Sequence, residues 1–409
     1  MKPFSLSGFD FSKFLLFTLI FIYSLFLFNI VKQGGSKSFF PETIFYLTIF
    51  TFILYKKINI NIKEYLFILF PFLFITLNEL LFHKNLSIDF IENDIISYNY
   101  LILLPLILLP SIIKKANFTE IHFFYILLTI NIFSIFFNTY INFILDFDRT
   151  LLDKKIGPII LYDYSIIVIS LITLILCFNY HKKYFYLTNF ICTFNILLII
   201  VHGSRGTWVA LPLIGLFIFY SFYKTHLKPL LLISSAGIVL LFSLYIFNPN
   251  ISERIIKFQQ DTNLISQSNY NNSIGQRVSM WTESIDQFKN EPILGIGYTN
   301  LKTALYNKNH VDHPHAHNLF IHELAAHGIL GFLGLLFSFL MPLYYFIIKK
   351  NEYSPAVRTA GITLIIYTSI CGLTDYVFIA KSACLLYFIL ITTLLSFNKE
   401  SNPGLPACK

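Results

Sequence analysis

The sequence is poor in charge. Asp, Glu, Lys and Arg make up only 13% of its 409 residues, whereas they make up about 25% of a typical soluble domain. Hydrophobic residues make up 56% of the chain, and its mean hydropathy is +0.66. A soluble fold cannot cover its surface with so few polar groups, so the composition predicts an integral membrane protein.

Cysteine is also scarce, and the common cofactor motifs are missing. The five cysteines show no C-x-x-C spacing, and four of them fall in or beside apolar stretches, so we expect no disulfide framework and no cysteine-based metal site. The segment "GIGYTN" at 295–300 lacks the third glycine and the preceding strand of a dinucleotide fingerprint. We therefore expect no cofactor from these motifs, neither a bound dinucleotide nor a cysteine-bound metal.

Long apolar runs are abundant. A transmembrane helix needs about 20 apolar residues, and such runs predict an all-α polytopic membrane protein with about twelve transmembrane helices. The predicted spans are 14–31, 39–55, 65–82, 98–113, 121–143, 158–178, 184–201, 207–223, 229–247, 328–348, 356–373 and 382–397.

The loops predict an orientation and four regions. Lys and Arg favour the short loops that are cytoplasmic when the N-terminus lies inside, so we expect both termini in the cytoplasm and the first span to stay as an anchor. The net charge of +8 then reflects topology, not nucleic-acid binding. The regions are 1–247 with helices 1–9, an outer loop at 248–327, helices 10–12 at 328–397, and a cytoplasmic tail at 398–409.

A few charged side chains fall inside or at the ends of the predicted spans. Charge in a bilayer is costly and often functional, and in this topology all of these residues lie toward the outer face. Each one alone can be a helix-end residue that reaches water, but their shared side favours an outward-facing polar cavity. They are Glu42, Glu79, Asp163, Arg205 and Asp375.

The long outer loop carries helical patterns. Ile251–Ile265 has apolar residues at helical spacing, and Ser273–Phe288 predicts a clearer amphipathic helix with Ser273 as its cap. Its apolar stripe of Val278, Trp281, Ile285 and Phe288 would lie on the membrane surface or on the bundle. Arg277 would then stand in the first turn of this helix.

The stretch "HPHAHNLFIHELAAHGILG" at 313–331 contains five histidines. A zincin helix needs H-E-x-x-H, and "HELAAH" separates His322 and His327 by five positions, so they do not share a helical face. His315 and His317 form an H-x-H with no Asp or Cys at a spacing that completes a tetrahedral site. Asp312 and His313 lie nearby, so a His/Asp metal site stays open as an alternative.

His317 differs from the other histidines by its position. A helix beginning near His317 or Asn318 would place this imidazole at the positive end of a helix dipole, which disfavours the charged ring. A neutral imidazole accepts a proton near pH 7. The same helix end attracts anions, which suggests a substrate that carries phosphate.

Four segments resemble the O-antigen ligase family. "HNLFIHELAAHGILG" at 317–331 matches the H-[NSQ]-x9-G-x-x-G pattern of the family, and "GSRGTWVALP" at 203–212 resembles its arginine turn. "GQRVSMWTESIDQFKNEPILGIG" at 275–297 is similar to its loop helix, and "GLTDYVFIAKS" at 372–382 to its aspartate segment. The predicted spans and large outer loop match as well, so the resemblance covers nearly the whole chain.

The resemblance implies a multi-span, GT-C-like glycosyltransferase. It would transfer O-antigen from undecaprenyl pyrophosphate to a sugar hydroxyl of lipid A-core on the periplasmic side of the bacterial inner membrane. It implies a base role for His317 and a pyrophosphate-stabilising role for Arg205 and Arg277. The expected substrate-binding residues are Asp375, His315, Asn318, Lys381 and Arg149. Two alternatives remain open: an O-antigen polymerase of the same superfamily, and a transporter of a lipid-linked oligosaccharide.

Overall fold

The computed structural model describes the C-terminal three quarters of the chain with several gaps. The described residues are 109–110, 113–114, 118–144, 151–152, 159–179, 185–247, 256–257, 259–261, 263–264, 272–309, 315–379 and 381–398. Among them every regular element is helical and none is a strand, which confirms the predicted all-α class. The principal helices are α6 (Glu120–Ile144), α8 (Ile159–Cys177), α9 (Phe185–Ile200), α10 (Arg205–Trp208), α11 (Ala210–Phe247), α13 (Ser273–Asn290), α14 (Tyr298–Asn309), α15 (Leu319–Ile348), α16 (Pro355–Thr374) and α17 (Lys381–Leu395), with 3-10 turns at Lys350–Glu352 and Val377–Ile379.

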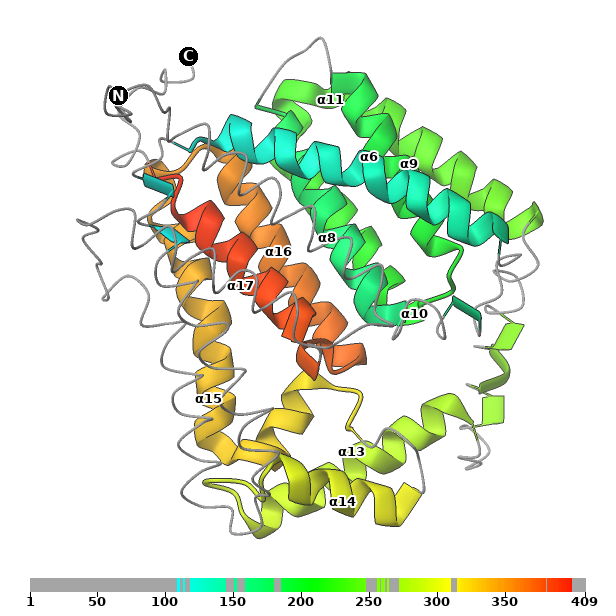
Figure 1. Cartoon of the computed structure of the whole chain (residues 1–409), viewed down its shortest axis with the longest axis vertical. Helices are drawn as coiled ribbons and strands as arrows, with labels where there is room; N and C mark the ends of the chain where they lie inside the picture. The colour runs from blue at the N-terminus through cyan, green and yellow to red at the C-terminus, as the bar shows by residue number, and fades with distance from the viewer. Residues whose placement is uncertain are drawn as a thin grey trace, which may run out of the picture.

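The bundle is built around α8. This helix is apolar on all sides and almost entirely buried, which is the pattern of a helix enclosed by neighbours. It packs against α6, α9, α16 and α17, which surround it in Figure 1. Helix α6 instead turns Phe133, Phe136 and Phe143 outward, as expected for a helix that meets lipid.

Among the described residues, five helices are long and apolar enough to cross a membrane: Glu120–Ile144, Ile159–Cys177, Gly206–Lys228, Leu319–Ile348 and Pro355–Thr374. Helices α9 and α17 are apolar but shorter. These helices match predicted spans from 121–143 onward and make the chain a multi-pass membrane protein. The spans 14–31, 39–55 and 65–82 lie outside the described residues, so the total of twelve stays a prediction. Helix α11 joins two predicted spans across a kink at His226.

The described part of the outer loop forms α13 and α14, which lie beside the lower end of α15 in Figure 1. Met280 of α13 and Leu301 of α14 are buried against the first part of α15. The predicted helix is confirmed, but the predicted cap is wrong: Asn272, not Ser273, accepts hydrogen bonds from the first-turn amides. Ile285 is 43% exposed and the other residues of the predicted stripe are half-buried, so the protein covers the stripe only in part; the buried positions of α13 are Gly275, Met280 and Ser284.

Helix α15 begins at Leu319, which confirms the predicted helix start near His317 or Asn318; it continues through the predicted span 328–348 and is kinked at Gly328. The kink is paired with the loop that precedes α14. The Gly297 amide donates to the carbonyl of Ala326 at 2.8 Å, and the Ile329 amide donates to that of Pro292 at 2.9 Å. The loop thus satisfies backbone groups that the kink releases from the helix.

Gly328 is required by this junction. Its φ of 65° and ψ of −166° lie in a region that is essentially restricted to glycine. A Cβ atom at this position would lie 2.2 Å from the carbonyl oxygen of Ile293. The second glycine of the pattern, Gly331, faces a similar limit because its Cβ would lie 2.2 Å from that of His327.

Replacing Gly328 with Ala should destabilise the protein. The backbone strain alone costs about 1–3 kcal/mol, and the collision with the loop adds to it. Gly215→Ala is the matched control, because nothing lies within 4 Å of the new methyl group and alanine favours a helix interior. Thermal unfolding of both variants in detergent measures the difference. Equal melting temperatures would contradict the role given to Gly328.

Candidate active site

The site forms where the C-terminal end of α16 meets three other segments. The last carbonyl groups of a helix have no partner within the helix. Here the side-chain amide of Asn318 donates to the carbonyl of Leu373 at 3.1 Å, and Nη1 of Arg277 donates to that of Thr374 at 2.9 Å. The Thr374 hydroxyl donates to the carbonyl of Gly206 at 3.4 Å. Segments that are far apart in the sequence are therefore joined at one helix end.

Asn318 connects α15 to α16 through a single amide. Its Oδ1 accepts hydrogen bonds from the amides of Phe320 and Ile321, each at 3.0 Å, so it is the N-cap of α15. Its Nδ2 is the donor to Leu373. The preceding residue, His317, has a φ of 46°, an uncommon conformation for a residue with a side chain. This backbone turn brings the imidazole of His317 to the end of α16.

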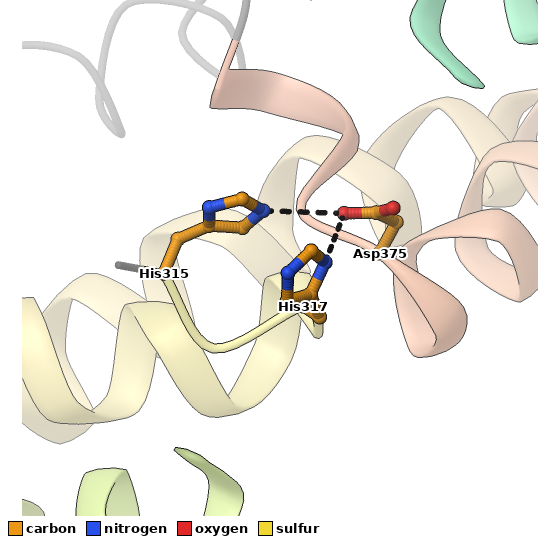
Figure 2. A group of neighbouring side chains, drawn as sticks. All are labelled: His315, His317 and Asp375. Carbon is orange, nitrogen blue, oxygen red and sulfur yellow. Dashed lines mark hydrogen bonds and ion pairs between the residues drawn. The ribbon is translucent and has the colours of Figure 1, made fainter. Parts of the chain in front are cut away.

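Asp375 is the C-cap of α16 and the centre of the cluster in Figure 2. Its Oδ1 lies 3.1 Å from Nδ1 of His317 and 3.5 Å from Nε2 of His315, and it accepts a hydrogen bond from the amide of Tyr376 at 2.8 Å. Its Oδ2 lies 4.0 Å from Nη2 of Arg277. Burial opposes ionisation, but the hydrogen bonds from the two histidines outweigh it and hold the pKa of Asp375 well below its usual range. The carboxyl is therefore a carboxylate.

His317 is the most accessible member of this cluster. Its side chain is 25% exposed, against 10% for Asp375. Burial lowers the pKa of His317 from its ordinary value, and the hydrogen bond with Asp375 offsets only part of that effect. The neutral ring donates from Nδ1 to the carboxylate, so Nε2 is the nitrogen that can accept a proton. The arrangement orients a base in the manner of a His/Asp dyad.

A buried network supports Asp375 from α15. The Tyr376 hydroxyl donates to Oε1 of Glu323 at 2.9 Å, and Oε2 of Glu323 lies 2.7 Å from Nδ1 of His327. The ring of His322 stacks on that of Tyr376 with centroids 4.1 Å apart, and its Nδ1 accepts from the amide of Ala316 at 3.4 Å. His322 and His327 therefore fix the segments that carry the dyad.

Sequence reasoning gave no role to Glu323 or Tyr376. The only signal was position: Tyr376 follows Asp375, and Glu323 lies between the last two histidines of the stretch. A pattern that lists residue types cannot show that these two side chains meet.

The arginine turn lies against the same end of α16. A Cβ at Gly206 would lie 2.7 Å from Oγ1 of Thr374, so the two backbones approach closely. The Tyr367 hydroxyl, also from α16, donates to the carbonyl of Thr207 at 3.2 Å. Arg205 is the first residue of α10, although its side chain lies outside the described part of the structure.

Asp163 does not face an outward cavity as expected. Its side chain is fully buried, and its Oδ1 lies 2.7 Å from Nδ1 of His202. Nε2 of His202 lies 2.9 Å from Oδ1 of Asn142. Charged residues inside a membrane bundle are usually paired with another polar group. Here Asp163 is paired with His202, which directly precedes the arginine turn in the sequence. Among the predicted outward acids, only Asp375 is placed by the structure at the candidate site.

For the remaining predicted site residues, the structure does not describe where the side chains lie. Lys381 begins α17, but its side chain lies outside the described residues, as does all of Arg149. Glu42, Glu79, Asp312 and His313 also lie outside them. The part of the site that the structure does assemble consists of His315, His317, Asn318, Asp375 and Arg277, with the arginine turn beside them.

The cluster also has the donor types of a metal site. One ligating atom each from His315, His317 and Asp375 lies within 4.8 Å of the other two. The carboxylate comes from a distant helix end and not from Asp312, so the spacing along the chain could not reveal this combination.

Comparisons with known proteins agree with the geometry. Residues 190–336 match a family model described as O-antigen ligase. The chain is 25% identical to the O-antigen ligase of Escherichia coli over 49% of its own length and 48% of the relative. It is 26% identical to an uncharacterized protein of Haemophilus influenzae over 40% of its own length and 44% of that relative. The chain thus spans about half the length of the curated relatives it matches.

The family match covers the arginine turn, α13, α14 and the first half of α15. It therefore includes Arg205, Arg277 and His317, while Asp375 lies beyond it in sequence but joins them in space. Over this segment the chain is similar to the O-antigen ligase family.

Proposed function

We propose that the protein is an O-antigen ligase. It transfers O-antigen polysaccharide from undecaprenyl pyrophosphate to a sugar hydroxyl of lipid A-core, on the periplasmic side of the bacterial inner membrane. The observation that carries this proposal is the oriented base: His317 hydrogen-bonded to Asp375, beside Arg277 and the arginine turn. The family match and the name of the Escherichia coli relative support it.

His317 acts as the general base in this proposal. Its Nε2 takes the proton of the acceptor hydroxyl while the hydroxyl oxygen attacks the anomeric carbon of the donor. The bond from that carbon to the pyrophosphate oxygen breaks, so undecaprenyl pyrophosphate leaves and the anomeric centre is inverted. The proton ends on His317, where the carboxylate of Asp375, 3.1 Å from Nδ1, stabilises the imidazolium.

Arg277 stabilises the leaving group. Negative charge grows on the pyrophosphate as the bond breaks, and guanidinium groups bind such anions through bidentate, charge-assisted hydrogen bonds. Nη1 of Arg277 is held by the carbonyl of Thr374, while the side chain as a whole is 28% exposed. This anchor orients the guanidinium without covering it. Arg205, on the neighbouring turn, supplies the second guanidinium.

A transporter fits these features less well. Alternating access places a binding site near the middle of the membrane. Here the candidate residues lie at the ends of helices: Asp375 after α16 and His317 before α15. A helix-end cluster with an oriented base suits chemistry at the membrane surface. Purified protein that forms a glycosidic bond from a lipid-linked donor and an acceptor would decide for the enzyme.

His317→Ala should abolish most of the transfer. Removing a general base costs about 10²–10⁴-fold in rate, so the O-antigen ladder on a lipopolysaccharide gel should disappear in a ligase-deficient host. His122→Ala is the control. His122 lies near the start of α6, where Glu120 contacts the N-cap of α16, at the opposite end of α16 from Asp375. A normal ladder from well-expressed His317→Ala protein would refute the base role.

Arg277→Lys should also lose most of the transfer although the charge is kept. Lysine cannot hold the Thr374 carbonyl and bind the pyrophosphate with one planar group, and loss of one such donor costs about 10²–10³-fold. Arg358→Lys, near the N-terminal end of α16, should keep wild-type rates. The readout is the rate of transfer by purified protein. Equal rates for the two variants would remove Arg277 from the mechanism.

The phenotype of a deletion separates ligase from polymerase. Loss of a ligase should leave bare lipid A-core and accumulated lipid-linked polymer, because polymerisation continues without transfer. Loss of a polymerase should leave core capped with single repeats. Core with single repeats would replace our proposal with the polymerase.

A further inference from the structure

We propose that His315, His317 and Asp375 form a binding site for Zn²⁺, and that Zn²⁺ in this site inhibits the enzyme. The binding step stands on the geometry alone. The inhibition step rests on the proposed function, because it assumes that His317 is the base.

The separations of the donor atoms suit a tetrahedral metal. Zinc bonds to nitrogen and oxygen of about 2.0–2.1 Å imply ligand atoms about 3.3–3.4 Å apart. Oδ1 of Asp375 lies 3.1 Å from Nδ1 of His317 and 3.5 Å from Nε2 of His315. One ligating atom of each residue lies within 4.8 Å of the other two, so zinc binding would require the side chains to rotate until the two imidazole nitrogens also reach about this separation.

The donor set and its surroundings also suit zinc. Two imidazoles and one carboxylate are the protein ligands of many zinc sites that keep a fourth position for water. The side chains of His315 and Asp375 are 11% and 10% exposed, while that of His317 is 25% exposed. The cluster is therefore more open to solvent on the side of His317. The amide of Tyr376 donates to the carboxylate and orients it, as outer-shell groups do around metal ligands. Figure 2 shows both rings directed at the same carboxylate oxygen.

Two features limit the affinity. Nη2 of Arg277 lies 4.0 Å from the second carboxylate oxygen, and its positive charge repels a cation. Nδ1 of His315 is buried and has no hydrogen-bond partner among the described residues, so the outer shell is incomplete on that ring. The site therefore suits an exchangeable inhibitory ion better than a resident cofactor.

Occupation of the site would disable the base. Zinc needs Nδ1 of His317 without its proton and the same Oδ1 that now accepts that proton. The metal would replace the hydrogen bond between His317 and Asp375 with two coordinate bonds. The one proton of the neutral ring then moves from Nδ1 to Nε2, which has no lone pair left to accept the proton of the acceptor hydroxyl, so transfer stops while zinc is bound.

Metal binding is tested on the full-length protein in detergent after treatment with a chelator. Co²⁺ should bind with one equivalent per chain and give the visible absorption of a tetrahedral complex, and Zn²⁺ should displace it. His315→Ala and Asp375→Asn should each weaken binding by more than about 10–100-fold, which is the loss expected when only an outer-shell partner is removed, and His122→Ala should not change it. Arg277→Gln should tighten binding, because it removes the repelling charge. The Arg277 variant keeps the three ligands, so it tests the site even if the Asp375 variant misfolds. No stoichiometric binding, or equal binding by the wild type and His315→Ala, would overturn the proposal.

Inhibition is tested in the transfer assay with lipid-linked donor and acceptor. Transfer should fall over the same Zn²⁺ concentrations that saturate the site and should return after chelation. Activation by Zn²⁺, or full activity with the site saturated, would overturn the inhibitory role. Absence of transfer by the metal-free wild type would instead contradict the proposed function and leave the binding result standing, so the two failures are distinguishable.

Discussion

The unpaired carbonyl groups at the C-terminal end of α16 are the constraint on which the site depends. Inside a membrane protein, a backbone carbonyl without a donor is costly. Here the donors are side chains of other segments, Asn318 for Leu373 and Arg277 for Thr374. The need to satisfy one helix end therefore brings α13 and the start of α15 to the same place. Residues proposed to act on the substrate are also residues that close the fold.

The electrostatics of the two helix ends explain why Asp375 and His317 tolerate each other. The C-terminal end of α16 is the negative end of its dipole and disfavours an added carboxylate, whereas the N-terminal end of α15 is positive and disfavours an imidazolium. The two helix ends meet through Asn318, so the positive end of the α15 dipole and the negative end of the α16 dipole partly offset each other. Contacts with His315, His317 and the Tyr376 amide further stabilise the carboxylate form of Asp375. The base is thus neutral at rest but stands next to a carboxylate that stabilises its charged form.

The sequence predicted the elements of the site better than their contacts. Apolar runs located the described spans, and the pattern around His317 and Asn318 located the start of α15, but it did not predict the kink at Gly328. The N-cap of α13 was harder to predict. Asn272 caps this helix although Ser273 stands beside it, because either side chain can accept the same hydrogen bonds. Asp163 was predicted to face outward, yet His202 holds it inside, and a partner from another helix leaves no trace in local periodicity. For the same reason, spacing could not join Asp375 to His315 and His317.

The proposed role of the histidine stretch at 313–331 depends on its contact with Asp375 at the end of α16. The spacing along α15 argues against a zincin, because His322 and His327 cannot share a helical face. In the structure, both residues belong to the buried network around Tyr376 and Glu323. The donors that remain, His315 and His317, meet a carboxylate from α16. In our proposal, a proton and a divalent cation would compete for the same lone pairs. A base that is oriented by a carboxylate next to a second imidazole would then be sensitive to metal ions, and the charge of Arg277, proposed to stabilise the leaving group, would limit that sensitivity.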